Sequence, residues 1–185
     1  MNGNFEQCLA LTLREEGGFV NDKRDPGGMT NLGVTRATYE QWVGRHVTDD
    51  EMRKLTLHDV QKIYKVNYWD RVRGDDLPIG VDMAVFDLAV NSGTSRAAKF
   101  LQQALAMPSD GIIGPKTIAA AYQRDPEELI EQICRERLQF LKQLSTWKTF
   151  GKGWSGRVER VEAAAKKMLA GLKKPTLKNV RPNVA

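Results

Sequence analysis

Residues 78–91 read PIGVDMAVFDLAVN, and this segment determines how the rest of the chain must pack. On a helical wheel its apolar side chains fall on nearly every side, whereas a surface helix has one apolar stripe. The pattern is typical of a helix that is buried all round, so we expect it to be the central helix of the domain. Its apolar residues are Val81, Met83, Val85, Phe86, Leu88 and Val90.

The polar residues of this segment are Asp82, Asp87 and Asn91. They need partners, because an unpaired buried charge destabilises a folded protein by several kcal/mol. Asp87 and Asn91 are four residues apart and therefore share one stripe of a helix. We expect both to face a common polar cavity or helix end.

The chain around this segment also has a mainly helical pattern. Residues 4–16 form an amphipathic helix, and residues 126 to about 147 repeat apolar side chains at three- and four-residue spacings. Residues 17–33 contain five Gly and one Pro, which predicts turns with at most short strands. We therefore predict a mainly α fold with a small Gly-rich loop or β-hairpin lobe. Further helix starts are indicated at Thr48, Thr56, Gly114-Pro115 and Asp125-Pro126.

The composition is that of an ordinary globular protein. A chain of 185 residues with 41% hydrophobic and 28% charged residues can bury one sizeable core, which excludes a disordered or collagen-like chain. No apolar run is long enough to insert stably in a membrane, and no secretion signal is evident at the N-terminus. The net charge of +5 comes from residues 166–185, which hold six basic residues and no acidic one. Because the rest is nearly neutral, we expect a basic flexible tail at 173–185 and no nucleic-acid partner.

Metal and cofactor chemistry finds no support in the sequence. His46 and His58 are twelve residues apart without further ligands at zinc-binding spacing, and no nucleotide-binding or GxSxG motif occurs. We predict no metal and no cofactor. Cys8 and Cys134 occupy apolar faces of predicted helices, so we expect buried free thiols in preference to a disulfide or a redox pair.

Glu16 is the first candidate for catalysis. On the wheel of the helix at 4–16 it falls at the centre of the apolar face formed by Leu9, Thr12 and Leu13, while Glu15 falls at its edge. Burial and the negative end of the helix dipole would both raise the pKa of a carboxyl group placed there. A carboxylic acid that stays protonated near neutral pH suits a general acid. The alternative is an exposed Glu at a frayed helix end.

Glycoside hydrolysis needs a second group, which acts as base, nucleophile or electrostatic stabiliser. The Gly-rich loop offers Asp22 and Asp25, with Thr30, Asn31 and Thr35 as hydroxyl or amide partners, although Asp and Asn are also common turn residues. Several aromatic side chains could stack on sugars in a cleft, or could belong to the core. They are Tyr39, Trp42, Tyr64, Tyr68 and Trp69.

Several of these segments together resemble the N-acetylmuramidases of glycoside hydrolase family 108, which occur in phage endolysins. The likeness begins with EGGFVND at 16–22 and DPGGMTNLGVT at 25–35, and it continues through YWD at 68–70 and GVDMAVFDLAVNSG at 80–93. Residues 101–117, LQQALAMPSDGIIGPKT, are similar to the predicted peptidoglycan-binding region that follows in this family.

This resemblance implies a lysozyme-like helical fold and cleavage of the β-1,4 bond between N-acetylmuramic acid and N-acetylglucosamine. It implies Glu16 as the acid, and Asp25 has the spacing of the second catalytic residue in helical phage lysozymes. In those lysozymes a Thr follows the second catalytic residue after five intervening residues. Asn31 occupies that position here and Thr30 lies one place earlier, so Thr30 is a catalytic candidate. Asn31, Tyr68 and Asn91 are substrate-binding candidates.

The resemblance also implies an organisation and a setting. We expect a muramidase region at 1–92, a helical peptidoglycan-binding region at 93–172 and the tail at 173–185. The protein would be a monomer that binds peptidoglycan glycan strands and stays in the host cytoplasm until a holin-like pore releases it to the cell wall. Alternatives are a non-catalytic peptidoglycan-binding protein and a bacterial secretion-associated muramidase.

Overall fold

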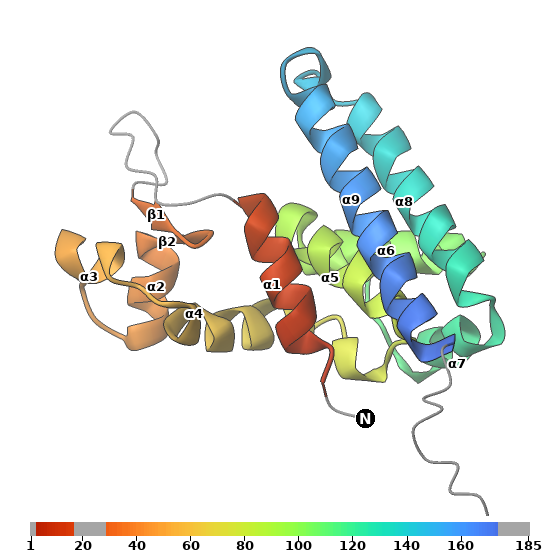
Figure 1. Ribbon diagram of the computed structural model, residues 1–185, viewed down its shortest axis with the longest axis horizontal. Coiled ribbons are helices and arrows are strands. Elements are labelled where there is room, and N and C mark those ends of the chain that lie inside the picture. Colours follow the sequence, from red (N-terminus) through yellow and green to blue (C-terminus); the bar gives the residue numbers. More distant parts are fainter. Residues whose placement is uncertain (1–2, 17–28, 174–185) are drawn as a thin grey trace, which may run out of the picture.

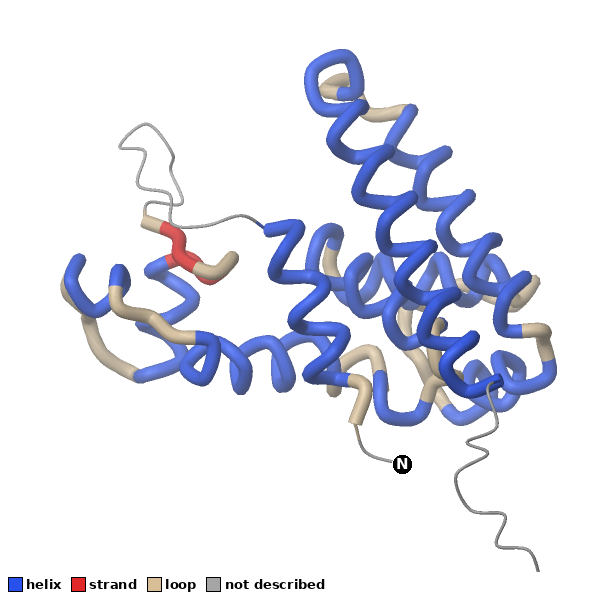
Figure 2. The backbone as a smooth tube through the Cα atoms, viewed as in Figure 1, coloured by secondary structure: helices blue, strands red, loops and turns tan. Residues whose placement is uncertain are grey.

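The computed structural model describes residues 3–16 and 29–173, and most of them are helical (Figure 2). This confirms the predicted mainly α fold. No helix among these residues is long and apolar enough to cross a membrane. The helices are α1 (Phe5–Glu16), α2 (Arg36–Val43), α3 (Asp49–Arg53), α4 (Leu57–Tyr64), α5 (Val81–Ser92), α6 (Thr94–Ala104), α7 (Pro115–Gln123), α8 (Pro126–Lys142) and α9 (Trp147–Lys173), with a π-helix η1 (Lys65–Trp69) and a 3-10 turn η2 (Gly74–Asp76).

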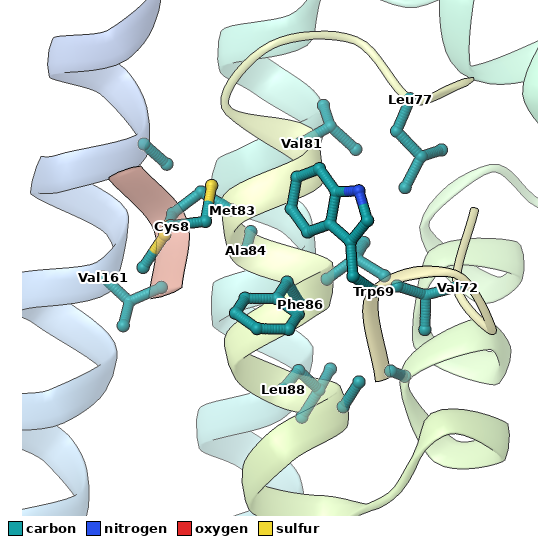
Figure 3. Close-up of a cluster of buried hydrophobic side chains, with 14 of the residues drawn as sticks. Cys8, Trp69, Val72, Leu77, Val81, Met83, Ala84, Phe86, Leu88 and Val161 are labelled. Carbon is teal, nitrogen blue, oxygen red and sulfur yellow. The ribbon is translucent and has the colours of Figure 1, made fainter. Parts of the chain in front are cut away.

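Helix α5 is the central helix, as its sequence predicts. Every residue from Val81 to Ala89 is buried, and α1, α6, α8 and α9 all pack against it. The ring of Phe86 makes T-shaped contacts with those of Phe5 and Trp69, with centroids 6.0 and 5.4 Å away. Figure 3 shows this cluster, with Cys8 of α1 and Val161 of α9 nearby. The helix that carries Glu16 is thus anchored on the central helix.

In the sequence, a small lobe lies between α1 and the other helices of this body. Strands β1 (Thr30–Asn31) and β2 (Val34–Thr35) form an antiparallel hairpin in which Thr30 pairs with Thr35 and Asn31 with Val34. Leu32 and Gly33 link the strands with φ angles of 49° and 72°, and positive φ at both central residues is characteristic of a tight type I′ hairpin turn. Helices α2, α3 and α4 complete the lobe (Figure 1). The predicted short strands in this region are confirmed.

The predicted helix starts are also confirmed, but one predicted end is wrong. Thr48 and Thr56 begin α3 and α4 with capping boxes, and Asp125 caps α8. Helix α8 ends at Lys142, not near Trp147. The backbone carbonyl of Thr146 accepts hydrogen bonds from the amides of Thr149 and Phe150, so a new helix starts there. The three- and four-residue spacing of apolar side chains continues across the break between α8 and α9. For this reason the sequence pattern did not reveal the new helix start at Thr146.

Helix α9 then runs antiparallel to α8 as far as Lys173. The predicted flexible tail, apart from Lys173, lies outside the described residues. Apolar side chains from Phe5 to Leu169 form one buried cluster. The predicted division into regions 1–92 and 93–172 stays a prediction.

Both cysteines are buried and unpaired, as expected. Burial raises the pKa of the Cys8 thiol and raises that of Cys134 to about 12, so neither forms the reactive thiolate near neutral pH. We expect no reaction with a thiol reagent such as DTNB at pH 8 in the folded protein and modification of both thiols in guanidinium chloride. Rapid modification in the native state would contradict this packing.

Candidate active site

The C-terminal end of α1 carries the predicted catalytic acid. Helix α1 ends at Glu16, and Cys8, Leu9 and Thr12 on its inner face are at most 2% exposed. The apolar face derived from the sequence is therefore the face that packs on the core. Glu16 follows Thr12 by one helical turn on that stripe. The side chain of Glu16, and residues 17–28 with Asp22 and Asp25, lie outside the described residues, so their catalytic roles stay predictions.

The residue before Glu16 is held by helix α9. Glu15 accepts two hydrogen bonds from the Arg160 guanidinium, from Nε at 2.8 Å and from Nη2 at 2.6 Å. This bidentate pair lowers the pKa of Glu15, so that carboxyl group is ionised at neutral pH. Glu15 thus has a structural partner, and the pair fixes the last turn of α1 against α9.

A buried cluster of charged groups lies beneath this end of α1. Asp87 on α5 is fully buried and accepts hydrogen bonds from Arg137 Nη1 at 2.7 Å and from Arg157 Nη2 at 2.8 Å. Burial raises the pKa of Asp87, but the two guanidinium groups outweigh this and hold it below its usual range. The cluster joins α5, α8 and α9, so the predicted substrate-binding end of α5 is fixed to the C-terminal helices.

Asn91 shares one of these arginines, as its position relative to Asp87 predicts. Its Oδ1 accepts a hydrogen bond of 3.3 Å from Arg137 Nη2. Asn91 is exposed in the last turn of α5, so it remains available as a substrate-binding candidate. The sequence reasoning missed Arg137, Arg157 and Arg160. Arg137 nevertheless lies on the apolar stripe of α8, at helical spacing from Ile133 and Leu141, and a basic residue on a buried stripe indicates a buried acidic partner.

Thr30 and Asn31, the two site candidates in strand β1, differ in burial and in hydrogen bonding. Thr30 is partly buried in β1. Asn31 is only 7% exposed, and its Nδ2 donates to the backbone carbonyls of Met52 at 2.8 Å and Arg53 at 3.3 Å. The side chain of Asn31 therefore ties the hairpin to the end of α3. Its substrate-binding role stays a prediction, as does the catalytic role of Thr30.

Replacing Asn31 by alanine should destabilise the small lobe by about 1–3 kcal/mol, because it leaves a buried carbonyl without its donor. We expect a lower midpoint of chemical unfolding, and the KM for peptidoglycan, measured on the folded variant, tests the substrate-binding role separately. Thr56→Ala, an exposed exchange at the start of α4 in the same lobe, removes only a capping residue. Its loss of stability is the reference against which the loss in Asn31→Ala is compared. A large rise in KM at unchanged stability would instead show that Asn31 contacts substrate.

The aromatic candidates separate into core and surface. Tyr64 and Trp69 are at most 2% exposed and belong to the core, which was the alternative for them. Tyr68 is partly buried in η1, with its ring centroid 5.6 Å from that of Tyr64. Trp42 is 40% exposed and lines a shallow pocket with Tyr39 on the small lobe. Tyr68 therefore stays a candidate for substrate binding. Within residues 3–16 and 29–173, no cluster of His, Cys, Asp or Glu could hold a metal ion.

Comparisons with known proteins agree with this architecture. The family described as glycosyl hydrolase 108 matches residues 9–93, and the one described as predicted peptidoglycan domain matches residues 96–159. The solved structure of Brucella abortus SagA is similar, with 44% sequence identity and a TM-score of 0.79. The likeness covers 90% of this chain and 95% of that one. No curated protein sequence matches the chain.

A mainly helical body with a small hairpin lobe at the end of α1, together with these matches, defines a lysozyme-like glycoside hydrolase. The chain belongs to the glycosyl hydrolase 108 family, and it acts on peptidoglycan.

Proposed function

We propose that the protein is a muramidase that hydrolyses the β-1,4 bond between N-acetylmuramic acid and N-acetylglucosamine. The observation that carries the proposal is the position of Glu16 at the end of a helix whose inner face is buried. The ion pair between Glu15 and Arg160 links the last turn of α1, which carries Glu16, to helix α9. A general acid needs this kind of fixed position relative to the bond it protonates.

In this mechanism Glu16 protonates the glycosidic oxygen as the bond to the muramic acid carbon breaks. Asp25 and Thr30 position the attacking water or stabilise the positive charge that develops on the sugar ring. Asn91 and Tyr68 bind the flanking sugars. The stereochemistry of the product distinguishes the two possible roles of the second catalytic group. Inversion requires a water between the two carboxyl groups, whereas retention requires a covalent or tightly stabilised intermediate.

Release of reducing sugar ends from purified, protein-free peptidoglycan tests whether the protein cuts or only binds. A muramidase produces reducing ends in proportion to time and enzyme, with a matching loss of turbidity. A protein that binds the wall without cutting it sediments with peptidoglycan and releases none, and that result would contradict the proposal.

For the biological role we propose a phage endolysin, which accumulates in the host cytoplasm as a monomer and reaches the wall through a holin-like pore. Cells that produce the protein should stay turbid until their membrane is permeabilised, and should then lyse within minutes. Lysis without permeabilisation would contradict dependence on a pore. The likeness to a protein of Brucella abortus, a bacterium, favours a second candidate role as a bacterial muramidase associated with secretion. Slow, limited cleavage after permeabilisation would support that role.

A further inference from the structure

Three aromatic side chains form a continuous surface on the first turns of α9. The ring centroid of Trp154 is 6.3 Å from that of Trp147 and 5.7 Å from that of Phe150. Phe150 is 52% exposed, while the two tryptophans are partly buried. Figure 1 shows that this part of α9 and the end of α8 extend past the ends of α1 and α5. We call Trp147, Phe150, Gly153 and Trp154 the α9 wall.

The orientation of the wall follows from the contacts further along α9. Arg160 pairs with Glu15 of α1, and Ala164 and Gly171 line a groove together with Leu11 of α1. Gly153 precedes these residues at helical spacing on the same side of α9. With a rise of about 1.5 Å per residue, Gly153 lies about 10 Å beyond Arg160 along the helix axis. The wall therefore continues the α1-facing side of α9 past the end of the helix that carries Glu16.

Two glycines in the first turns of α9, Gly151 and Gly153, differ in what a side chain would meet there. Each Gly inside a helix costs about 1 kcal/mol relative to Ala. Gly151 has an internal reason, because a Cβ there would lie 2.7 Å from the indole ring of Trp147. At Gly153 a Cβ would meet no atom within 4 Å, so no packing within the described structure requires glycine. What singles out Gly153 is its position, because it is exposed next to Trp154 and leaves the helix backbone there open to a ligand.

We propose that the α9 wall binds the glycan strand of peptidoglycan next to the bond that is cut. Sugar rings would stack their C–H faces on the exposed ring of Phe150 and on the accessible parts of the two tryptophans, and Gly153 would let the strand approach the helix backbone. Lys148 and Lys152 are exposed beside the wall, and their charge complements the carboxylates of the peptide stems. The region that matches a predicted peptidoglycan domain is then one side of the cleft and not a separate anchor.

This inference rests on the proposed muramidase function, and two variants test it separately. Gly153→Leu should raise the KM for soluble glycan strands by roughly tenfold or more without lowering the thermal midpoint, because leucine favours helix and a Cβ at this exposed position meets no protein atom within 4 Å. Phe150→Ala should raise the KM roughly two- to tenfold. Gly171→Leu, at the other end of α9 where a Cβ is equally free of contacts, and Tyr122→Ala, which removes an exposed ring from α7, should leave the KM unchanged.

The outcomes separate the two proposals. Wild-type KM values for both Gly153→Leu and Phe150→Ala would overturn the proposed glycan binding by the α9 wall. The proposed muramidase function would be unaffected by that result. If the wild-type protein releases no reducing ends, the muramidase proposal fails, and sedimentation with insoluble peptidoglycan then tests the wall alone. The wall predicts weaker sedimentation of Gly153→Leu and Phe150→Ala than of the wild type and the two controls. Equal sedimentation of all five proteins would overturn it.

Discussion

Glu16→Gln should lower the release of reducing ends from peptidoglycan by a factor of about 10²–10⁴, because the amide cannot donate the proton that the leaving oxygen needs. The exchange preserves size, so the thermal midpoint should stay that of the wild type. Initial rates of reducing-end release, measured at equal concentrations of folded protein, provide the comparison.

Glu6→Gln is the matched control, because Glu6 is an exposed acid in the first turn of the same helix. We expect it to retain the wild-type rate. If Glu16→Gln also retained that rate, Glu16 would not be the general acid. Loss of activity in both variants would point to damage to α1 and not to the loss of a proton donor.

The largest effect on stability should come from Asp87→Ala. This exchange leaves Arg137 and Arg157 buried without their shared carboxylate, and breaking a buried ion pair from one side costs about 3–5 kcal/mol. We expect a loss of that size in the free energy of unfolding measured with urea. Glu131→Ala removes a partner of Lys166 that is partly exposed to solvent, and it should cost less than about 1 kcal/mol. Equal losses in the two variants would contradict a specific role for the buried cluster.

The same cluster predicts a pH dependence of stability. The pKa of Asp87 is lower in the folded protein than its usual value of about 3.9, so its contribution is complete above that pH. The contribution is lost as the pH falls through the lower folded value. Between pH 5 and 2 the wild-type protein should therefore lose more stability than Asp87→Ala does. Parallel curves would contradict the assignment.

The sequence predicts much of the fold for a physical reason. Burial of the segment from Val81 to Ala89 is visible because apolar residues occupy every side of one helix. Capping residues such as Thr48 and Asp125 act locally, so helix starts follow directly from neighbouring residues. The inner face of α1 follows from its wheel in the same way.

The missed features depend on contacts between distant parts of the chain. Arg157 and Asp87 are 70 residues apart, and Arg160 and Glu15 are 145 apart, so only the packed helices bring them together. The hydrogen bonds from Asn31 to the end of α3 likewise depend on the position of that helix relative to the hairpin. The break between α8 and α9 was hidden because the apolar side chains on both sides of it serve one core.

The sugar at the new reducing end tests the central claim most directly. Purified peptidoglycan is digested with the wild-type protein, the fragments are reduced with borohydride, and mass spectrometry identifies the terminal residue. A muramidase leaves reduced N-acetylmuramic acid at that end in every major fragment. Reduced N-acetylglucosamine, a 1,6-anhydro end or intact strands with cleaved peptide stems would each contradict the account.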